Sequence, residues 1–390
     1  MTSIADMNTL YDAYKASRKS SPWKPETQKF GASLLHNLTQ LCRELETGTY
    51  KTSTGSEFVL RERGKIRHVH GNRMKDKIVR RALCDTILSP DLEPYMIYAN
   101  GASQKGKGPD FSRSLFEKHL HNYWLKYRSN TGWVLFGDFS KYYDNIQHEK
   151  AISAIAFRIE PDSVWLLQEA FENFRIDVSY MTDEEYKNCL SNKFVSLDYY
   201  ANIPKEMHTG EKYMAKSVDI GDQVSQNVGI YYPTPIDNYV TIVRGHRYYG
   251  RYMDDFYIIG DSKEYLQETL RGIKAIAEDL GIFINEKKTR IIPLSSRFTF
   301  LQMKYWLTES GRVVKRINPK AVTRERRKLK AYRRLLDNQR MIYEEIENAY
   351  KSWMGRYYKV MSRKQVKNMQ LLYQELFDGR NPRWKKKSIQ

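Results

Sequence analysis

The chain has 390 residues, with 65 Lys and Arg against 46 Asp and Glu, which gives a formal net charge of +19. No stretch reaches the roughly 18 apolar residues that a membrane span needs, and the N-terminus lacks the basic and apolar blocks of a signal peptide. The three cysteines are far apart and no pair has metal-ligand spacing, so we do not expect a disulfide framework. We therefore expect a soluble, cytoplasmic protein with no membrane partner. The basic excess favours a phosphate-rich partner.

The first half of the chain predicts helices that alternate with short strands. Leucines recur at helical spacing near the N-terminus, and later apolar runs are bounded by Gly, Pro and Ser. The expected elements are a helix over 34–45 ended by Gly48, two strands within 56–70, a helix over 74–88 stopped by Ser89 and Pro90, a Gly/Lys loop over 100–109, a helix over 111–128, a strand over 133–139 and a helix from 149.

The second half begins with a polar segment over 175–215, for which we expect an irregular insertion with a lobe of its own. Prolines at 233 and 235 predict a kink in a helix over 224–243. The other expected elements are a hairpin over 248–260, a helix over 262–280 ended by Gly281, strands over 282–284, 291–293 and 298–306, a basic helical bundle over 319–376 and a basic tail.

Three aspartates stand where predicted strands end. Asp138 closes the apolar strand, and Asp254 and Asp255 occupy a tight turn between apolar runs. Side chains alternate faces along a strand, so we expect Asp254 to face a metal site and Asp255 to lie at its edge. Clustered carboxylates remain ionised together only with cations between them. The pattern predicts a site for two Mg²⁺ ions, or Mn²⁺, that join a nucleotide to a growing strand.

Two segments resemble reverse transcriptases. Phe136-Gly137-Asp138 through 146 is similar to the first palm motif of that family, and 252–255 is similar to its catalytic turn. The resemblance implies an α+β right-hand polymerase that copies an RNA template into a DNA product from dNTPs, with Asp138, Asp254 and Asp255 as catalytic residues. The implied parts are a helical extension over 1–48, fingers over 49–132, a palm with an antiparallel sheet over 133–316, a helical thumb over 317–377 and the tail over 378–390.

Under this resemblance, several residues would contact the incoming nucleotide. Tyr143 matches an aromatic that collides with a 2′-hydroxyl, although an ordinary buried aromatic would give the same pattern. Lys65 and Arg67 resemble a hairpin that grips the triphosphate, and the guanidinium fork suits phosphate oxygens. His68 and His70 follow on the same strand, but no further His or Cys lies at ligand spacing, so the sequence predicts no metal there.

The resemblance also implies contacts with primer and template. Lys105 and Lys107 lie in a loop similar to a template-side segment, where lysines neutralise phosphates. Lys288 is a candidate to protonate the pyrophosphate leaving group, or an ordinary surface lysine. The remaining assignments are Phe139 at the metal and nucleotide sites, Gly221, Ser225 and Gln226 at the nucleotide site, Tyr252 and Met253 at the primer and template, and Leu301 and Gln302 in a segment like the primer grip, where Gln302 replaces a common Gly.

One motif departs from the usual pattern of the family. Ile220 stands where a Gln is common, and Gln226 follows Ser225 where a Pro is common. This variant resembles enzymes of diversity-generating elements and of bacterial defence groups. Antiphage defence with a structured noncoding RNA and diversification with an accessory protein are both open. Template-independent or protein-primed synthesis, and a non-catalytic RNA-binding protein with this fold, are further alternatives. The template, the primer and the oligomeric state do not follow from the sequence.

Overall fold

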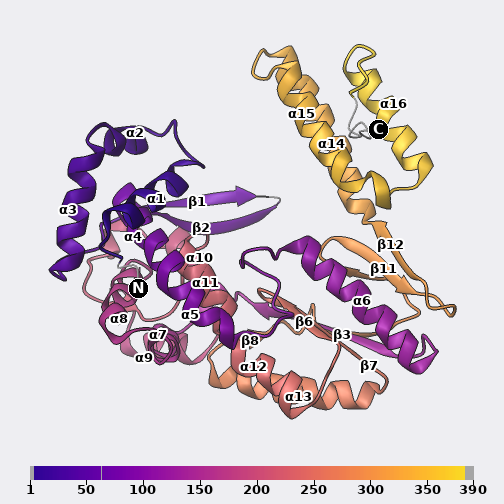
Figure 1. The fold of residues 1–390 in the computed structure, drawn as a ribbon, viewed down its shortest axis with the longest axis horizontal. Helices are drawn as coiled ribbons and strands as arrows, with labels where there is room; N and C mark the ends of the chain where they lie inside the picture. The colour runs from indigo at the N-terminus through magenta and orange to yellow at the C-terminus, as the bar shows by residue number, and fades with distance from the viewer. Residues whose placement is uncertain (1–3, 63, 383–390) are drawn as a thin grey trace. The chain divides into compact units, whose positions relative to one another are not determined.

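The computed structural model describes residues 4–62 and 64–382, and its contacts divide the chain into two compact units. Unit 1 consists of Met1–Phe116 and Val134–Ile291, and unit 2 consists of Glu117–Trp133 and Ile292–Gln390. The elements of each are labelled in Figure 1. The finer division into fingers, palm and thumb stays a prediction. Most of the predicted basic tail, from residue 383 onward, lies outside the described residues.

Unit 1 opens with helices that form as predicted. Leu38, Leu41 and Leu45 are buried along one helix face because they recur at helical spacing. Gly48 follows with a φ of 65°, which confirms the predicted end of that helix. The three helices are α1 (Met7–Arg18), α2 (Pro25–Ala32) and α3 (Leu34–Glu46).

An antiparallel hairpin follows, formed by β1 (Ser56–Glu62) and β2 (Lys65–Gly71), which confirms the two predicted strands. Figure 1 shows it projecting as a two-stranded ribbon. Phe58, Leu60 and Ile66 are exposed on it, so the hairpin does not belong to the core along its whole length.

The helix predicted over 74–88 does not stop at Ser89 and Pro90. It continues through a wider, π-helical turn into the next helix. Pro90 lies in the first turn of that helix, where a backbone N–H has no partner within the helix, so proline is tolerated. The segments are α4 (Met74–Leu83), a π-helical turn (Cys84–Leu88), α5 (Ser89–Leu92) and a 3₁₀ turn (Glu93–Tyr95), and α6 (Pro109–Tyr127) confirms the helix predicted over 111–128.

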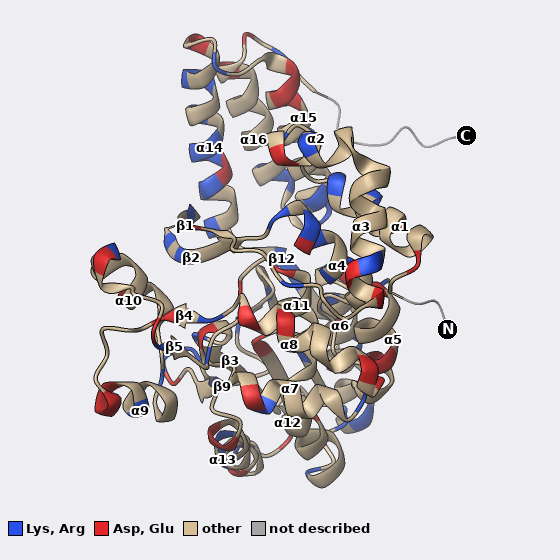
Figure 2. Ribbon diagram, turned by 90° about the vertical axis from the view of Figure 1, so that its left-hand side faces the viewer, with Lys and Arg blue, Asp and Glu red and all other residues tan. Residues whose placement is uncertain are grey.

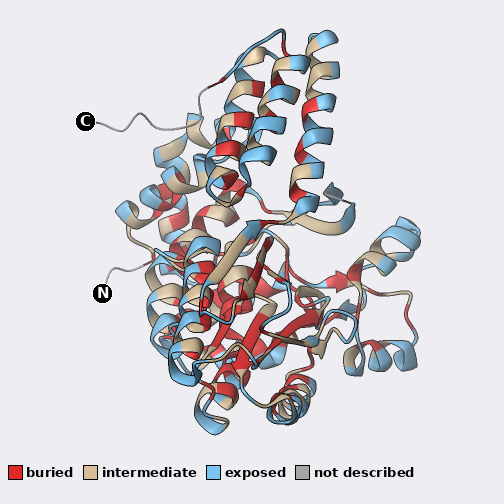
Figure 3. Ribbon diagram, turned by 90° about the vertical axis from the view of Figure 1, so that its right-hand side faces the viewer, coloured by how far each residue is buried: buried red, intermediate tan, exposed pale blue. Residues whose placement is uncertain are grey.

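A five-stranded sheet forms the centre of unit 1. Its strand order is β6-β7-β3-β8, with β9 also paired to β3. Figure 3 shows the buried residues concentrated on these strands, and side chains such as Leu135, Ile258 and Ile273 form the core beside them. The strands are β3 (Trp133–Ser140), β6 (Tyr249–Tyr252), β7 (Asp255–Gly260), β8 (Phe283–Ile284) and β9 (Arg290–Pro293).

Helices pack around this sheet. The predicted break near the prolines at 233 and 235 is confirmed, because one helix ends before Pro233 and the next begins with Thr234 and Pro235. Gly281 ends the last helix with a φ of 75°. The segments are a 3₁₀ turn (Tyr143–Asn145), α7 (His148–Ala156), a 3₁₀ turn (Pro161–Ser163), α8 (Val164–Glu172), α11 (Gln223–Tyr231), α12 (Thr234–Asn238), a π-helical turn (Tyr239–Val243) and α13 (Lys263–Asp279).

The segment over 175–215, predicted to be irregular, contains regular elements. Its polarity reflects its small size, since few of its side chains are buried. Val178, Phe194 and Met214 belong to a hydrophobic cluster of the segment's own. Its elements are β4 (Ile176–Asp177), α9 (Asp183–Ser191), α10 (Ser196–Asn202), a 3₁₀ turn (Lys205–Met207) and β5 (Tyr213–Met214), with β4 and β5 antiparallel.

Unit 2 combines a three-stranded sheet with three C-terminal helices and the second part of α6. The single strand predicted over 298–306 is wrong, because Leu301 and Gln302 form a turn between two paired strands. The helical bundle predicted over 319–376 is confirmed, and Figure 2 shows Lys and Arg along its first helix. The elements are β10 (Phe298–Phe300), β11 (Met303–Leu307), β12 (Val313–Ile317), α14 (Pro319–Asp337), α15 (Tyr343–Tyr357), a 3₁₀ turn (Tyr358–Val360) and α16 (Arg363–Leu376).

Among the described residues, none of the helices is both long enough and apolar enough to cross a bilayer.

Candidate active site

The three predicted catalytic aspartates lie together in unit 1. The backbone N–H of Phe139, next to Asp138, donates to the carbonyl oxygen of Asp254 at 3.2 Å, which joins the end of β3 to the β6–β7 turn. Asp138 is only 5% exposed. Asp138 contributes to the raised pKa of Asp255, so the two side chains lie close to one another. The expectation that Asp254 faces the metal site and Asp255 lies at its edge stays a prediction.

The turn that carries Asp254 is tight and strained. Tyr252 pairs with Asp255, so Met253 and Asp254 alone connect the two strands. Met253 has a φ of 55°, a conformation that non-glycine residues adopt at a cost of about 1–2 kcal/mol. Strain of this kind is retained where the surrounding structure holds a functional geometry.

The sheet leaves little space behind the first aspartate. A Cβ at Gly137 would lie 2.0 Å from Cζ of Phe256, so only glycine fits beside that ring. Phe139 points into the same core, with its ring centroid 5.8 Å from that of Phe256. Phe139 could therefore contribute only its backbone carbonyl to a metal site.

The carboxylates carry more negative charge than the protein neutralises. Burial and the charge of Asp138 raise the pKa of Asp254, and burial with the charges of Asp254 and Asp138 raises the pKa of Asp255 to about 7. Lys288 opposes both shifts. A compact group of oxygen donors that disfavours its own ionisation fits a divalent cation, and Mg²⁺ prefers oxygen ligands.

Lys288 provides the positive charge that the site does possess. Its Nζ lies 2.8 Å and 2.7 Å from the two carboxylate oxygens of Asp138. Asn285, which the sequence did not single out, donates from its side chain to Asp138 at 3.0 Å and from its backbone N–H to the carbonyl oxygen of Asp138 at 2.7 Å. The fold thus brings Lys288 to the carboxylate of Asp138, and Asn285 orients the same carboxylate.

A buried ion pair supports the turn from inside the core, and it was not among the predictions from the sequence. Arg251 and Asp237 are fully buried and joined at 2.6 Å, and Tyr249 also donates to Asp237 at 2.6 Å. Arg251 donates to the carbonyl oxygen of Met253 at 3.2 Å. One signal in the sequence could have found this pair. Arg251 lies within an apolar strand two residues before the turn, and a charged side chain there needs a buried partner.

Tyr143 lies against the same turn. Its hydroxyl is 3.7 Å from Sδ of Met253, and burial raises its pKa. A Cβ at Gly229 would come within 3.0 Å of the Tyr143 hydroxyl, and the neighbouring Tyr142 donates to the carbonyl oxygen of Gly229 at 2.8 Å. Gly229 therefore sets the space in which Tyr143 stands.

The loop over 219–222 leads into α11 through a buried cap. Asp222 accepts from the backbone N–H groups of Val224 and Ser225 at 2.8 Å and 3.2 Å, and it pairs with the buried Arg80 at 2.7 Å. Gly221 has a φ of 98°, which explains why glycine stands there. The Ser225 hydroxyl is buried without a hydrogen-bond partner. Its contact with a nucleotide stays a prediction.

Gln226, one position further along α11, receives a hydrogen bond from the Ser103 hydroxyl at 3.4 Å. Ser103 belongs to the Gly/Lys loop, which lies beside the β6–β7 hairpin. Gly101 donates to the carbonyl oxygen of Arg251 at 3.0 Å, and Arg251 donates to that of Ala99 at 3.1 Å.

The basic residues near the site differ in their exposure and in whether their charged groups are already bonded within the protein. Lys65 acts electrostatically on Asp254 and lowers its pKa, and Arg67 is half-buried on β2. Lys105 is exposed. Lys107 instead directs its ammonium at oxygens of its own loop, those of Tyr98, Asn100 and Gln104, at 3.0, 3.2 and 2.7 Å. These bonds shape the loop, and the phosphate contact of Lys107 stays a prediction.

Leu301 and Gln302 lie in unit 2, at the β10–β11 turn, with φ values of 42° and 70°. A positive φ at both central residues is typical of the tight turns that join hairpin strands. It also explains why a glycine would suit position 302.

Comparison with known proteins places these motifs in a family. A model of the reverse transcriptase (RNA-dependent DNA polymerase) family matches residues 60–305, which include all three aspartates. The chain belongs to the reverse transcriptase family. This membership confirms the predicted α+β polymerase fold.

The more specific comparisons add little to the family assignment. No curated protein matches this reverse transcriptase. Among solved structures, it is similar to the telomerase of Candida albicans in complex with a fragment of telomeric RNA, with 12% sequence identity and a TM-score of 0.43. The match covers 86% of this chain and 60% of the telomerase chain, so this chain spans less than two thirds of that one.

Proposed function

We propose that the chain is an RNA-directed DNA polymerase that adds deoxynucleotides to a primer paired with an RNA template. The observation that carries the proposal is the convergence of Asp138, Asp254 and Asp255 at one end of a buried sheet, with the pKa values of Asp254 and Asp255 raised by burial and by the neighbouring carboxylates. A group of three such carboxylates disfavours its own charge and fits hard divalent cations.

The carboxylates of Asp138, Asp254 and Asp255, with the backbone carbonyl of Phe139, would hold the metal. When bound there, two Mg²⁺ ions, or Mn²⁺, would lower the pKa of the primer 3′-hydroxyl and neutralise charge on the triphosphate. Arg251 keeps the turn in position through its bond to the carbonyl oxygen of Met253.

The remaining side chains would orient the nucleotide. Lys65 and Arg67 bind the triphosphate, and Gly221 lets the new base pair approach the backbone. Tyr143 excludes the 2′-hydroxyl. Lys288, whose pKa is raised by its bond to Asp138 in spite of partial burial, stays protonated and holds a proton next to the reacting groups.

Incorporation of dNTPs on a primed RNA template tests this activity. We expect Asp254→Asn to abolish incorporation while RNA binding is kept, because the substitution removes one metal ligand and leaves the fold intact. The matched control is Asp261→Asn, an exposed aspartate just after β7, which should incorporate dNTPs at the wild-type rate. Wild-type RNA binding with no incorporation by the wild-type chain would instead support a non-catalytic RNA-binding protein.

For the biological role, we propose antiphage defence with a structured noncoding RNA as partner. The support is the variant motif around Ile220, Ser225 and Gln226, which resembles defence-associated groups. The same motif resembles enzymes of diversity-generating elements, so that role is the alternative. Template-independent or protein-primed synthesis by this chain is a further alternative to templated copying.

Sequencing the nucleic acid that copurifies with the full chain distinguishes these roles. One structured RNA and DNA complementary to it support defence. DNA copied from a template repeat beside a variable-protein gene supports diversification. DNA without any complementary RNA supports template-independent synthesis and contradicts the copying proposed here.

A further inference from the structure

Three potential metal ligands meet at the base of the β1–β2 hairpin, apart from the catalytic carboxylates. His68 and His70 point to the same face of β2 because side chains two residues apart share a face. Glu57 stands directly opposite His70 in the strand register. One ligand atom from each of the three lies within 4.8 Å of the other two.

The ring of His68 faces Glu57 without a well-formed hydrogen bond. Its side chain is 5% exposed, and its Nε2 lies 3.3 Å from Oε2 of Glu57 but makes no hydrogen bond. Tyr200, on α10, stacks on the ring with the centroids 3.8 Å apart, so the imidazole cannot turn away to find a partner. Buried polar atoms nearly always have a well-formed hydrogen bond, so a nitrogen that only contacts a carboxylate is free to bind an ion placed between them.

His70 has the environment of a metal-binding histidine. Its Nδ1 lies 2.7 Å from the carboxylate of the buried Asp219, and its Nε2 faces Glu57 at 2.5 Å. Histidines that bind metals usually donate their second ring N–H to a carboxylate, which fixes the tautomer and leaves the other nitrogen for the ion. Asp219 occupies that position here.

We propose that Glu57, His68 and His70 form a binding site for one transition-metal ion of the Zn²⁺ class, with His68 Nε2, His70 Nε2 and a Glu57 oxygen as ligands and a fourth position open to water. Two histidines and one glutamate are a known ligand set of zinc. Imidazole nitrogens favour such metals over Mg²⁺, which prefers oxygen. On binding, the ion replaces the proton shared by His70 and Glu57, and that proton passes to solvent.

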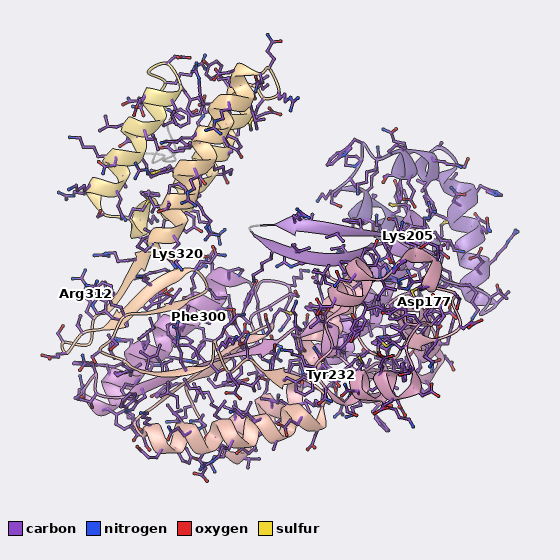
Figure 4. The ribbon with its side chains drawn as sticks, turned by 180° about the vertical axis from the view of Figure 1, so that it is seen from behind. Asp177, Lys205, Tyr232, Phe300, Arg312 and Lys320 are labelled. Atoms are coloured by element: carbon purple, nitrogen blue, oxygen red, sulfur yellow. The ribbon has the colours of Figure 1, made fainter. Side chains whose placement is uncertain are left out.

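The three ligand atoms can move close enough together to bind an ion of this size. Zinc holds its ligands at about 2.0–2.2 Å, so the donor atoms must approach one another slightly. Glu57 can make this movement, since its side chain is 45% exposed. A cavity of about 710 Å³ lined by Glu57, His70 and Tyr200 gives access from solvent, and Figure 4 shows Asp177 and Lys205, which also line it.

The ion would connect parts of unit 1 that are far apart in sequence. It would bridge the two strands of the hairpin and, through the bond between His70 and Asp219, tie them to the loop that ends in Asp222, the cap of α11. We therefore expect the metal to stabilise the position of the β1–β2 hairpin against that loop.

Titration of the chelator-treated full chain with Co²⁺ and Zn²⁺, in excess Mg²⁺ to fill oxygen-only sites, tests the proposal. We expect one equivalent of Co²⁺ to give the intense visible absorption of a four-coordinate site, and Zn²⁺ to displace it. His68→Gln and Glu57→Gln should each lower the affinity by about 100-fold or more, beyond the roughly 10–100-fold expected for the outer residue in Asp219→Asn.

Two histidines outside the cluster provide matched controls. His246→Gln removes a buried histidine and His36→Gln an exposed one, and both variants should keep the wild-type affinity. Zn²⁺ should also raise the Tm of the wild type but not that of Glu57→Gln, whose exposed side chain can be changed without disturbing the core. Absence of a saturable one-equivalent Co²⁺ spectrum in the wild type, or unchanged affinity in Glu57→Gln, would overturn the proposal.

Discussion

Single residues in this chain are held by partners that a motif does not reveal. Met253, in the turn before Asp254 and Asp255, takes a left-handed backbone conformation. Arg251 keeps that conformation in place from inside the core. The reactive groups of the proposed polymerase therefore depend on a buried scaffold as much as on the aspartates.

Tyr143→Ala should weaken sugar discrimination. The ring stands against the catalytic turn, and removing it opens the space that a 2′-hydroxyl would need. We expect the ratio of kcat/KM for dNTP over rNTP to fall by about 10-fold or more, the scale on which an enzyme pocket discriminates by one small group. The control is Tyr142→Phe, which loses only a hydroxyl bonded to Gly229. Unchanged sugar selectivity in Tyr143→Ala would refute the assignment.

Arg251→Met should destabilise unit 1 strongly. It leaves Asp237 buried and without its cation, and breaking a buried pair in this way costs about 3–5 kcal/mol. Urea unfolding measures the effect. Arg244→Met is the matched control, because its partner Glu268 is largely exposed and exposed pairs contribute little to stability. Equal losses in the two variants would show that Arg251 has no special role.

At the scale of elements, the sequence predicts what is local and misses what depends on distant partners. Strand β3, the β6–β7 hairpin and α13 were predictable because apolar periodicity and turn residues depend only on residues close together in the sequence. The insertion over 175–215 was not, since its small core gives a weak apolar signal. No pattern in the sequence reveals the three loop oxygens that Lys107 binds.

The β10–β11 turn gives a test at this scale. Gln302 is exposed and has a φ of 70°, so Gln302→Gly should raise the free energy of unfolding of unit 2 by up to about 1 kcal/mol, since glycine avoids the left-handed penalty. Thr299→Gly, within β10, should lower it by about 0.5–1 kcal/mol because strand glycines cost entropy. Urea unfolding that shows the same loss in both variants would contradict the described turn.

For the whole molecule, the net charge of +19 is the dominant property. Basic residues occur in both units, and α14 carries them on its exposed face (Figure 2). Backbone contacts by such residues release counterions from nucleic acid and make binding depend on salt but not on sequence. This is what an enzyme that must bind a duplex at any position requires.

Replacing Arg327, Lys330 and Arg334 by Gln should weaken RNA–DNA binding and its salt dependence. If each residue neutralises one phosphate, the slope of log affinity against log salt should decrease by about 2–3, from roughly 0.7–0.9 per contact. The matched control removes three exposed basic residues of unit 1, namely Arg18, Lys19 and Lys24. Equal changes in slope for the two triple variants would show a general charge effect rather than contacts along α14.

Counting the divalent ions held by the carboxylates tests the central claim most directly. Mn²⁺ bound to the full chain is measured by electron paramagnetic resonance with a chain-terminated primer on an RNA template and the matching dNTP, in the His68→Gln background so that the hairpin histidines do not contribute. We predict about two Mn²⁺ ions per chain, and loss of at least one of them in Asp138→Asn and in Asp254→Asn. The same number of ions, bound with the same affinity, in the parent and in both variants would contradict a polymerase site built on these aspartates.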